Sequence, residues 1–211
     1  MRVLMVAATE GELARVVTDS TRHRVVTLIT GVGMVATAAH VARALARETF
    51  DMALNVGLCG AFDRTLPLGA VVHVVRDECS ELGVEDGATF VSAAEMGLVA
   101  SEEPPYTGGR LVNDTPPTCA ALDTLPRVTG ITVNTVHGDD PSIAAVMSRC
   151  QPQVESMEGA AFMYACLAAG VRFAQVRAVS NYVERRNRAA WDIPAAVTAL
   201  GRTTTTILEQ V

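Results

Sequence analysis

The chain lacks three features that would assign it to common classes of protein. It has no excess of positive charge, since 17 Lys and Arg stand against 23 Asp and Glu and give a net charge of −6, which disfavours nucleic acid and anionic membranes. It has no long apolar run, because the first one, residues 1–8, breaks at Thr9 and is too short for a signal core or a membrane span. It also lacks closely spaced cysteine pairs, and we expect neither a zinc site nor a disulfide framework from Cys59, Cys79, Cys119, Cys150 and Cys166.

These absences favour a cytoplasmic protein that binds a small molecule, with no metal and no nucleic acid or membrane as partner. The 211 residues suffice for one sizeable domain, and they contain neither an internal repeat nor a low-complexity tract. Segments typical of strands and helices alternate along the chain. We therefore expect a single α/β domain over residues 1–211, a three-layer α/β/α sandwich around a mixed, mainly parallel sheet.

The expected strands are short apolar segments, several of them uninterrupted as in sheets covered on both faces. They comprise residues 1–8, 25–30, 51–56, 70–75, 130–136 and 171–179. The expected helices comprise residues 34–47, 142–150, a segment beginning at Met157, and residues 189–208 with Pro194 in an early turn. Residues 77–118 follow neither pattern, and we interpret them as an excursion that carries a substrate lid or a subunit contact.

Residues 154–161, VESMEGAA, join an acidic turn to a helix of small residues. Ser156 is the expected N-cap, which would place Glu158 in the first turn. A carboxylate at that position is stabilised by the helix dipole and needs no ligand. The alternative is that Met157 and Glu158 hold a sugar, with the thioether against its face and the carboxylate accepting hydrogen bonds from two vicinal hydroxyls.

Polar and glycine-rich segments follow the ends of several expected strands. Thr9, Glu10 and Glu12 come after the first strand, residues 57–62 after the third, and residues 180–188 after the last. In open α/β sheets, ligands bind at the carboxyl ends of the strands. The glycines at 57 and 60 either let the backbone approach a ligand closely or form a tight turn.

Residues 31–36, GVGMVA, match the dinucleotide-binding pattern between a strand and a helix. That fingerprint also requires an acid at the end of the following strand, to hold the adenosine ribose. Here the strand ends without a carboxylate, and Asp51 lies at its other end. We therefore reject a nicotinamide site and interpret the glycines as a close-approach loop over a helix N-terminus.

Four separated segments together resemble the nucleoside phosphorylase and nucleosidase superfamily: residues 8–12 (ATEGE), 30–33 (TGVG), 55–62 (NVGLCGAF) and 154–161 (VESMEGAA). Within it, residues 177–188 (RAVSNYVERRNR) resemble the futalosine hydrolases, and the methylthioadenosine/S-adenosylhomocysteine nucleosidases are the next most similar. The resemblance implies a nucleoside phosphorylase-like fold, cleavage of an N-ribosidic bond without a cofactor, and a homodimer or larger homo-oligomer.

The resemblance also implies roles for individual residues. Glu12, the second acid of the Glu-x-Glu, matches the carboxylate that activates water, while Met157 and Glu158 match the ribose contacts. Leu58, Cys59 and Gly60 match the segment that flanks base and sugar. The other substrate contacts that we expect are Thr9, Gly57, Phe62, Ser180, Tyr182 and Arg185.

Asn181 distinguishes the candidate substrates. Adenine-specific relatives carry Asp at this position, where it protonates the purine N7. An amide cannot deliver a proton in that way, but its donor and acceptor faces suit a 6-oxopurine. The resemblance, with this substitution, therefore implies hypoxanthine as the base. The simpler alternative is that Asn181 caps the turn after the strand.

The sequence departs from the resemblance in two places. Residues 138–141, GDDP, lack the aromatic residue that stacks on the base in the adenine nucleosidases, and Phe62, Tyr182 or Trp191 would have to replace it. The benzoate of futalosine would pair with one of Arg185, Arg186 and Arg188, unless these arginines are only a solvated face. No sequence neighbour marks a histidine as catalytic, whether His23, His40, His73 or His137.

The sequence thus predicts an N-glycosyl hydrolase that releases hypoxanthine from futalosine, a step of an alternative menaquinone pathway. A methylthioadenosine/S-adenosylhomocysteine or aminofutalosine nucleosidase is the nearest alternative. A purine nucleoside phosphorylase is disfavoured because Glu10 and Glu12 would repel phosphate. A nucleoside-binding protein without activity remains the alternative outside the enzymes.

Overall fold

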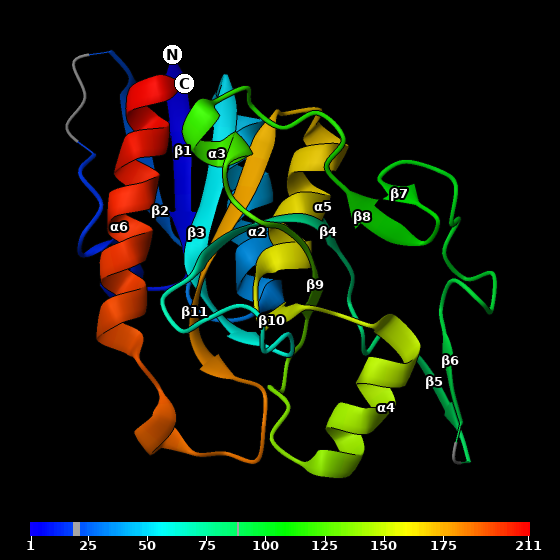
Figure 1. The fold of residues 1–211 in the computed structure, drawn as a ribbon. Coiled ribbons are helices and arrows are strands. Elements are labelled where there is room, and N and C mark those ends of the chain that lie inside the picture. Colours follow the sequence, from blue (N-terminus) through cyan, green and yellow to red (C-terminus); the bar gives the residue numbers. More distant parts are fainter. Residues whose placement is uncertain (19–21, 88) are drawn as a thin grey trace.

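The computed structural model describes residues 1–18, 22–87 and 89–211, in which a central sheet carries helices on both faces (Figure 1). The strands are β1 (Arg2–Ala7), β2 (Arg24–Ile29), β3 (Met52–Ala61), β4 (Val71–Asp77), β5 (Gly83–Asp86), β6 (Thr89–Ser92), β7 (Tyr106–Thr107), β8 (Arg110–Val112), β9 (Arg127–Thr132), β10 (Val154–Ser156) and β11 (Phe173–Tyr182). The helices are α1 (Glu10–Leu13), α2 (Met34–Arg47), α3 (Ala120–Asp123), α4 (Asp140–Cys150), α5 (Gly159–Ala169) and α6 (Ile193–Gln210), with a short 3-10 helix η1 (Arg188–Ala190).

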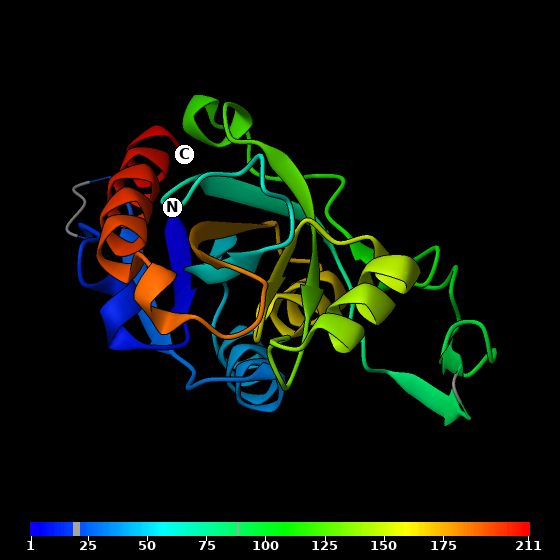
Figure 2. The ribbon, with the colours of Figure 1, turned by 60° about the horizontal axis from the view of Figure 1, so that its bottom comes forward.

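One half of the sheet is parallel, and its strands β1, β3 and β11 are buried on both faces. Its strands run in the order β2, β1, β3, β11, and β3 and β11 pair from Ala53 to Ala61 with one register shift near Asn181. Such strands are apolar almost throughout, which explains the uninterrupted runs in the sequence. Their carboxyl ends meet at the lower edge in Figure 1, which Figure 2 turns toward the viewer.

The other half of the sheet closes on itself. β3 pairs with β10, β10 with β9, β9 with β4, and β4 with β11, which returns to β3. All five strands send apolar side chains into the interior of this ring: Cys59, Ala61, Val72, Val74, Val128, Val154 and Val179. The expected mixed, mainly parallel sheet is confirmed, and the ring is a feature that the sequence patterns did not predict.

Alternate residues of β1 face opposite layers. Val3 and Met5 belong to the core that Leu200 and other residues of α6 cover, whereas Leu4 and Val6 pack in the core that contains Val41 of α2. α5 packs beside α2 on that second face, where it contributes Phe162, Met163 and Cys166. The three-layer sandwich expected from the alternation of elements is therefore confirmed.

Two strands are longer than the sequence patterns predicted. β3 continues through Ala61 because β11 pairs with it along Gly57–Ala61, so the tight turn considered for residues 57–62 is wrong. β11 in turn extends to Tyr182, which places Ser180 and Asn181 on a strand instead of a loop. By contrast, β9 ends at Thr132, four residues before the expected end of that strand.

Helix α5 begins later than expected. Ser156 is the last residue of β10, and Glu158, not Ser156, occupies the N-cap position. The Ser156 hydroxyl still accepts a hydrogen bond from the Gly159 N–H at 3.2 Å, so it keeps part of the predicted capping role. At the other end of the chain, Pro194 lies in the first turn of α6 as expected.

The excursion between β4 and α3 carries the short strands β5 to β8. The β5–β6 hairpin projects away from the sheet in both views (Figures 1 and 2). Among the helices of the described residues, none combines the length and apolar character needed to cross a bilayer.

Candidate active site

Glu12 is fixed at the carboxyl edge of the sheet by three donors. The backbone N–H and the hydroxyl of Thr9 donate to Oε2 at 2.9 and 3.2 Å. The N–H of Leu58 donates to Oε1 at 3.1 Å. Because α1 starts directly after β1, the side chain of Glu12 reaches back across the strand end to β3. Thr9 and Leu58 therefore hold this carboxylate in one orientation.

Gly57 lies directly beneath this carboxylate. A Cβ on Gly57 would come within 2.7 Å of Glu12 Oε1 and would overlap the guanidinium of Arg177. The position requires glycine because two charged side chains approach the backbone of β3. The groups that approach this glycine closely are side chains of the protein itself, while the expected approach to a ligand stays a prediction.

Glu158 is 5% exposed and has two partners. Its Oε1 accepts a hydrogen bond from the Gly33 N–H at 3.0 Å, and its Oε2 lies 3.8 Å from Arg177 Nη1. Gly33 has a φ of +99°, a conformation that favours glycine. The loop that matched a dinucleotide-binding pattern therefore holds a carboxylate, and the carboxylate of Glu158 is not simply stabilised by its own helix.

Arg177 is 1% exposed and was missed by the sequence analysis. Its Nε donates to Gln175 Oε1 at 3.1 Å, and its Nη2 donates to Asn55 Oδ1. Gln175 Nε2 in turn donates a hydrogen bond to Asp77 Oδ2 at 3.0 Å. Burial raises the pKa of Asp77 to about 6. The available signal was an arginine between two apolar neighbours, a valine and an alanine, in a segment expected to be a buried strand, since a buried charge needs partners.

Asn181 lines a small cavity of about 100 Å³ at the carboxyl end of β11. Its Oδ1 accepts a hydrogen bond from the Ser180 hydroxyl at 2.9 Å, and its Nδ2 donates to the Tyr182 carbonyl at 3.1 Å. A Cβ on Gly60 would lie 3.2 Å from this Nδ2, so the second glycine of β3 also leaves room for a polar side chain. The other lining residues include Val136, His137, Gly138, Glu155, Tyr182, Arg186 and Trp191.

The cluster around Glu12 and the cavity around Asn181 share one strand. Gly57 underlies the first and Gly60 the second, and three residues of a strand span roughly 10 Å. A single nucleoside can bridge that distance, with its ribose between Glu12 and Glu158 and its base at Asn181. The structure therefore brings together the residues expected to act on sugar and base.

The remaining expected site residues divide into three groups. Tyr182 and Trp191 line the cavity, and the guanidinium of Arg186 lies 5.7 Å from the centre of the Trp191 ring. Met157 does not line the cavity and is half-buried next to Glu158 in the chain. Phe62 packs against the cluster that contains Ile131 and Val146 and does not line the cavity. Arg185 is exposed and does not line it either.

Cys59 contributes backbone only. Its side chain points into the interior of the strand ring, where burial raises the pKa of the thiol to about 12. A neutral, buried thiol is a poor nucleophile. Among residues 1–18, 22–87 and 89–211, no group of three His, Cys, Asp or Glu side chains is arranged to hold a metal ion.

The sequence and the fold both match a known class of proteins. The phosphorylase superfamily model covers residues 7–211, and the chain belongs to this superfamily. A solved structure with the same fold is the 5′-methylthioadenosine/S-adenosylhomocysteine nucleosidase of Neisseria meningitidis in complex with methylthio-immucillin-A. It has a TM-score of 0.80 and 16% identity, with 99% of this chain and 98% of that chain covered.

Two curated relatives define the family more narrowly. The futalosine hydrolase of Thermus thermophilus is 32% identical over 87% of this chain and 80% of its own length. That of Acidothermus cellulolyticus is 33% identical over 82% of this chain and 70% of its own length. Within the superfamily, the chain is a member of the futalosine hydrolase family.

Gly57→Ala tests whether the contact between β3 and Glu12 sets the geometry of the site. The added methyl group must displace Glu12 and Arg177, and a displacement of about 1 Å costs roughly 10²-fold in turnover. We expect kcat for base release from a nucleoside to fall by about that factor. The matched control is Gly11→Ala, where a Cβ meets only Thr9 Oγ1 at 3.8 Å. If folded Gly57→Ala keeps the wild-type kcat, the contact between β3 and Glu12 does not set the geometry of the site.

Proposed function

We propose that the protein hydrolyses the N-ribosidic bond of futalosine and releases hypoxanthine, in the cytoplasm, as a step of menaquinone biosynthesis by an alternative route. The observation that carries the proposal is the pair of fixed carboxylates, Glu12 and Glu158, in the carboxyl-terminal half of the sheet, with the amide of Asn181 beside Gly60, three residues further along β3 than Gly57. The curated relatives named futalosine hydrolase supply the identity of the nucleoside.

Cleavage develops positive charge on the ribose and negative charge on the departing base. Glu12 accepts a proton from a water molecule whose oxygen attacks C1′, while the electrons of the C1′–N9 bond move to the base, which takes up a proton from solvent to give neutral hypoxanthine. Glu158 accepts hydrogen bonds from the 2′- and 3′-hydroxyls and stabilises the positive charge on the ring. The hydrogen bonds from Thr9 and Leu58 fix the orientation of the Glu12 carboxylate. Gly33 and Arg177 fix that of the Glu158 carboxylate.

Two features support hydrolysis over phosphorolysis. Glu12 and Glu158 place negative charge beside the ribose, where phosphate would have to bind. The guanidinium of Arg177 is already engaged by Glu158, Gln175 and Asn55. A phosphate at this position would compete with these partners and would be repelled by the carboxylates.

The direct experiment is to incubate the protein with futalosine, aminofutalosine, inosine and methylthioadenosine, with and without phosphate, and to identify the released bases by chromatography. We expect hypoxanthine from futalosine as the main product, at a rate that does not depend on phosphate. Adenine from methylthioadenosine as the main product would favour the nucleosidase alternative, and dependence on phosphate would overturn hydrolysis.

Glu12→Gln tests the general base. The amide keeps the shape of the side chain but cannot accept a proton from water, and general-base catalysis contributes roughly 10²–10⁴-fold. We expect kcat to fall by about that factor while the affinity for futalosine, measured by calorimetry, changes little. Turnover that survives unchanged would remove Glu12 from the mechanism. A wild-type protein that binds nucleosides but never cleaves them would favour the binding-protein alternative.

Asn181→Asp tests the contact with the base. A carboxylic acid at this position can protonate N7, so we expect the preference to shift toward 6-aminopurines by about tenfold or more. The measurement is kcat/KM for futalosine relative to aminofutalosine. Asn187→Asp, in the exposed segment that follows β11, makes the same chemical change outside the cavity and should leave the ratio unaltered. An unaltered ratio in Asn181→Asp would count against the role given to Asn181.

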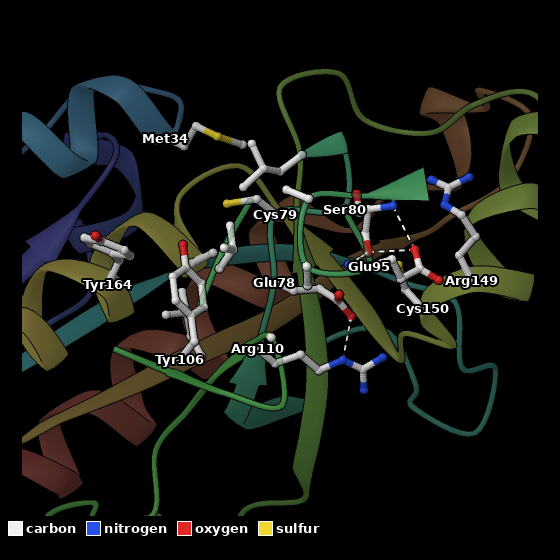
Figure 3. Close-up of a pocket in the computed structure, with 18 of the residues that line it drawn as sticks. Met34, Glu78, Cys79, Ser80, Glu95, Tyr106, Arg110, Arg149, Cys150 and Tyr164 are labelled. Carbon is white, nitrogen blue, oxygen red and sulfur yellow. Dashed lines mark hydrogen bonds and ion pairs between the residues drawn. The ribbon is translucent and has the colours of Figure 1, made fainter. Parts of the chain in front are cut away.

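The proposal extends to a homo-oligomer that forms through the face carrying α2 and α5. A cavity of about 700 Å³ opens there, bordered by Met34, Tyr106 and Tyr164, as Figure 3 shows. The adjacent side chain of Val35 is 79% exposed, and exposed apolar patches of this kind mark interaction sites. The excursion between β4 and α3 forms the far wall of the cavity, in keeping with the subunit contact expected for it.

Val35→Glu tests this surface, because a charge placed in an apolar contact must lose its hydration. We expect sedimentation velocity to show an oligomer for the wild type and a monomer for Val35→Glu. Val17→Glu is the control, since Val17 is 59% exposed and lies beside Thr205 of α6, on the other side of the sheet. A monomeric wild type would overturn the proposal of self-association.

A further inference from the structure

The cavity around Asn181 contains a second polar side chain that the mechanism above does not use. Glu155 is 4% exposed and lies on β10 between Gly60 of β3 and Ile131 of β9. Its neighbour Val154 points into the strand ring, so Glu155 points out of the ring and into the cavity. A buried carboxylate costs free energy unless it is paired or has a ligand to bind.

One residue holds this carboxylate within the protein. The backbone N–H of His137 donates to Glu155 Oε1 at 3.1 Å, and His137 Nδ1 lies 2.7 Å from Oε2. A carboxylate accepts up to about four hydrogen bonds, so acceptor positions remain for a ligand. His137 thus orients the carboxylate without saturating it.

Glu155 and Asn181 meet above Gly60. From the position that a Cβ of Gly60 would occupy, Asn181 Nδ2 is 3.2 Å away and Glu155 Cγ is 3.6 Å away. The Asn181 Oδ1 accepts the Ser180 hydroxyl, and Nδ2 donates one of its two hydrogens to the Tyr182 carbonyl, so the second hydrogen of Nδ2 is available to a ligand. The cavity therefore presents a donor and an acceptor side by side.

We propose that Glu155 selects the base, by accepting a hydrogen bond from the N1–H of a 6-oxopurine while Asn181 donates to its O6 or N7. This inference rests on the proposed function. A 6-oxopurine presents an acceptor at position 6 next to a donor at N1, which complements Asn181 and Glu155. A 6-aminopurine presents the reverse, a donor at position 6 next to an N1 lone pair, and it faces like groups at both positions.

Glu155 also provides a discrimination between 6-oxopurines and 6-aminopurines that Asn181 cannot provide alone. An amide can rotate by half a turn and exchange its donor and acceptor, so it discriminates weakly between the two purine edges. A carboxylate cannot change in this way because it only accepts. In this arrangement Glu155 contacts the base, and His137 is a positioning residue that acts through Glu155.

Glu155→Gln tests the inference in the intact protein. The glutamine amide retains an acceptor for the His137 N–H but can turn its NH₂ group toward N1 of the base. We expect kcat/KM for futalosine to fall by about 10- to 100-fold, since a charge-assisted hydrogen bond is lost. We expect kcat/KM for the 6-amino analogue to rise or stay constant, so that the ratio of the two falls.

Asp63→Asn is the matched control for Glu155→Gln. The carboxylate of Asp63 also accepts from a backbone N–H and from side chains, namely the N–H and hydroxyl of Thr65 at 2.9 and 2.6 Å and Gln153 Nε2 at 3.2 Å, but it does not line the cavity. We expect wild-type values for both substrates. If folded Glu155→Gln and Asp63→Asn show the same ratio of kcat/KM for futalosine to kcat/KM for the 6-amino analogue, Glu155 does not select the base.

A measurement on the wild type keeps the inference testable if Glu155→Gln does not fold. Hypoxanthine and 1-methylhypoxanthine are compared as product inhibitors, since the second lacks the N1–H. We expect 1-methylhypoxanthine to bind at least tenfold more weakly, and equal inhibition would overturn the inference. Failure of the proposed function has a different signature, namely that the wild type releases no base from futalosine.

Discussion

The site depends on one buried charge. Arg177 stands on β11, and its guanidinium is held by Gln175 and Asn55 while it also faces Glu158. A buried ion pair contributes little net stability, but removal of one partner costs roughly 3–5 kcal/mol because the other is left uncompensated. Arg177 therefore explains how the acidic side chain of Glu158 can lie in a nearly dry position at the edge of the sheet, available to sugar hydroxyls.

The pairing of β3 with β11 sets the distance between the two ends of the substrate. Gly57 and Gly60 on β3 lie beside the sugar cluster and the base cavity, and Arg177 and Asn181 on β11 pair with these same positions. Since both strands also belong to the closed ring, the spacing is fixed by backbone hydrogen bonds and does not depend on flexible loops. The same two strands therefore hold the proposed sugar and base contacts at a fixed spacing.

The sequence predicted those parts of the fold that local signals determine. Helix α2 has the expected bounds, because its alanine-rich pattern starts directly after Gly33 and needs no distant partner. The length of β3 was missed because glycines such as Gly57 and Gly60 are common in turns. Here a larger residue at either position would clash with side chains from α1, β10 and β11. Arg177 and Glu155 were missed for the same reason. Their importance comes from partners far along the chain, and no local pattern identifies those partners.

The closed ring also limits which parts of the protein tolerate amino-acid substitutions. A strand inside a ring cannot shift its register without disturbing both neighbours, so the interior formed by Cys59, Val72, Val128, Val154 and Val179 ties the five strands together. The segments at 136–138 and 183–191, by contrast, border the cavity without belonging to the ring. Substitutions in these two segments can therefore reshape the cavity while they leave the pairing of the ring strands intact.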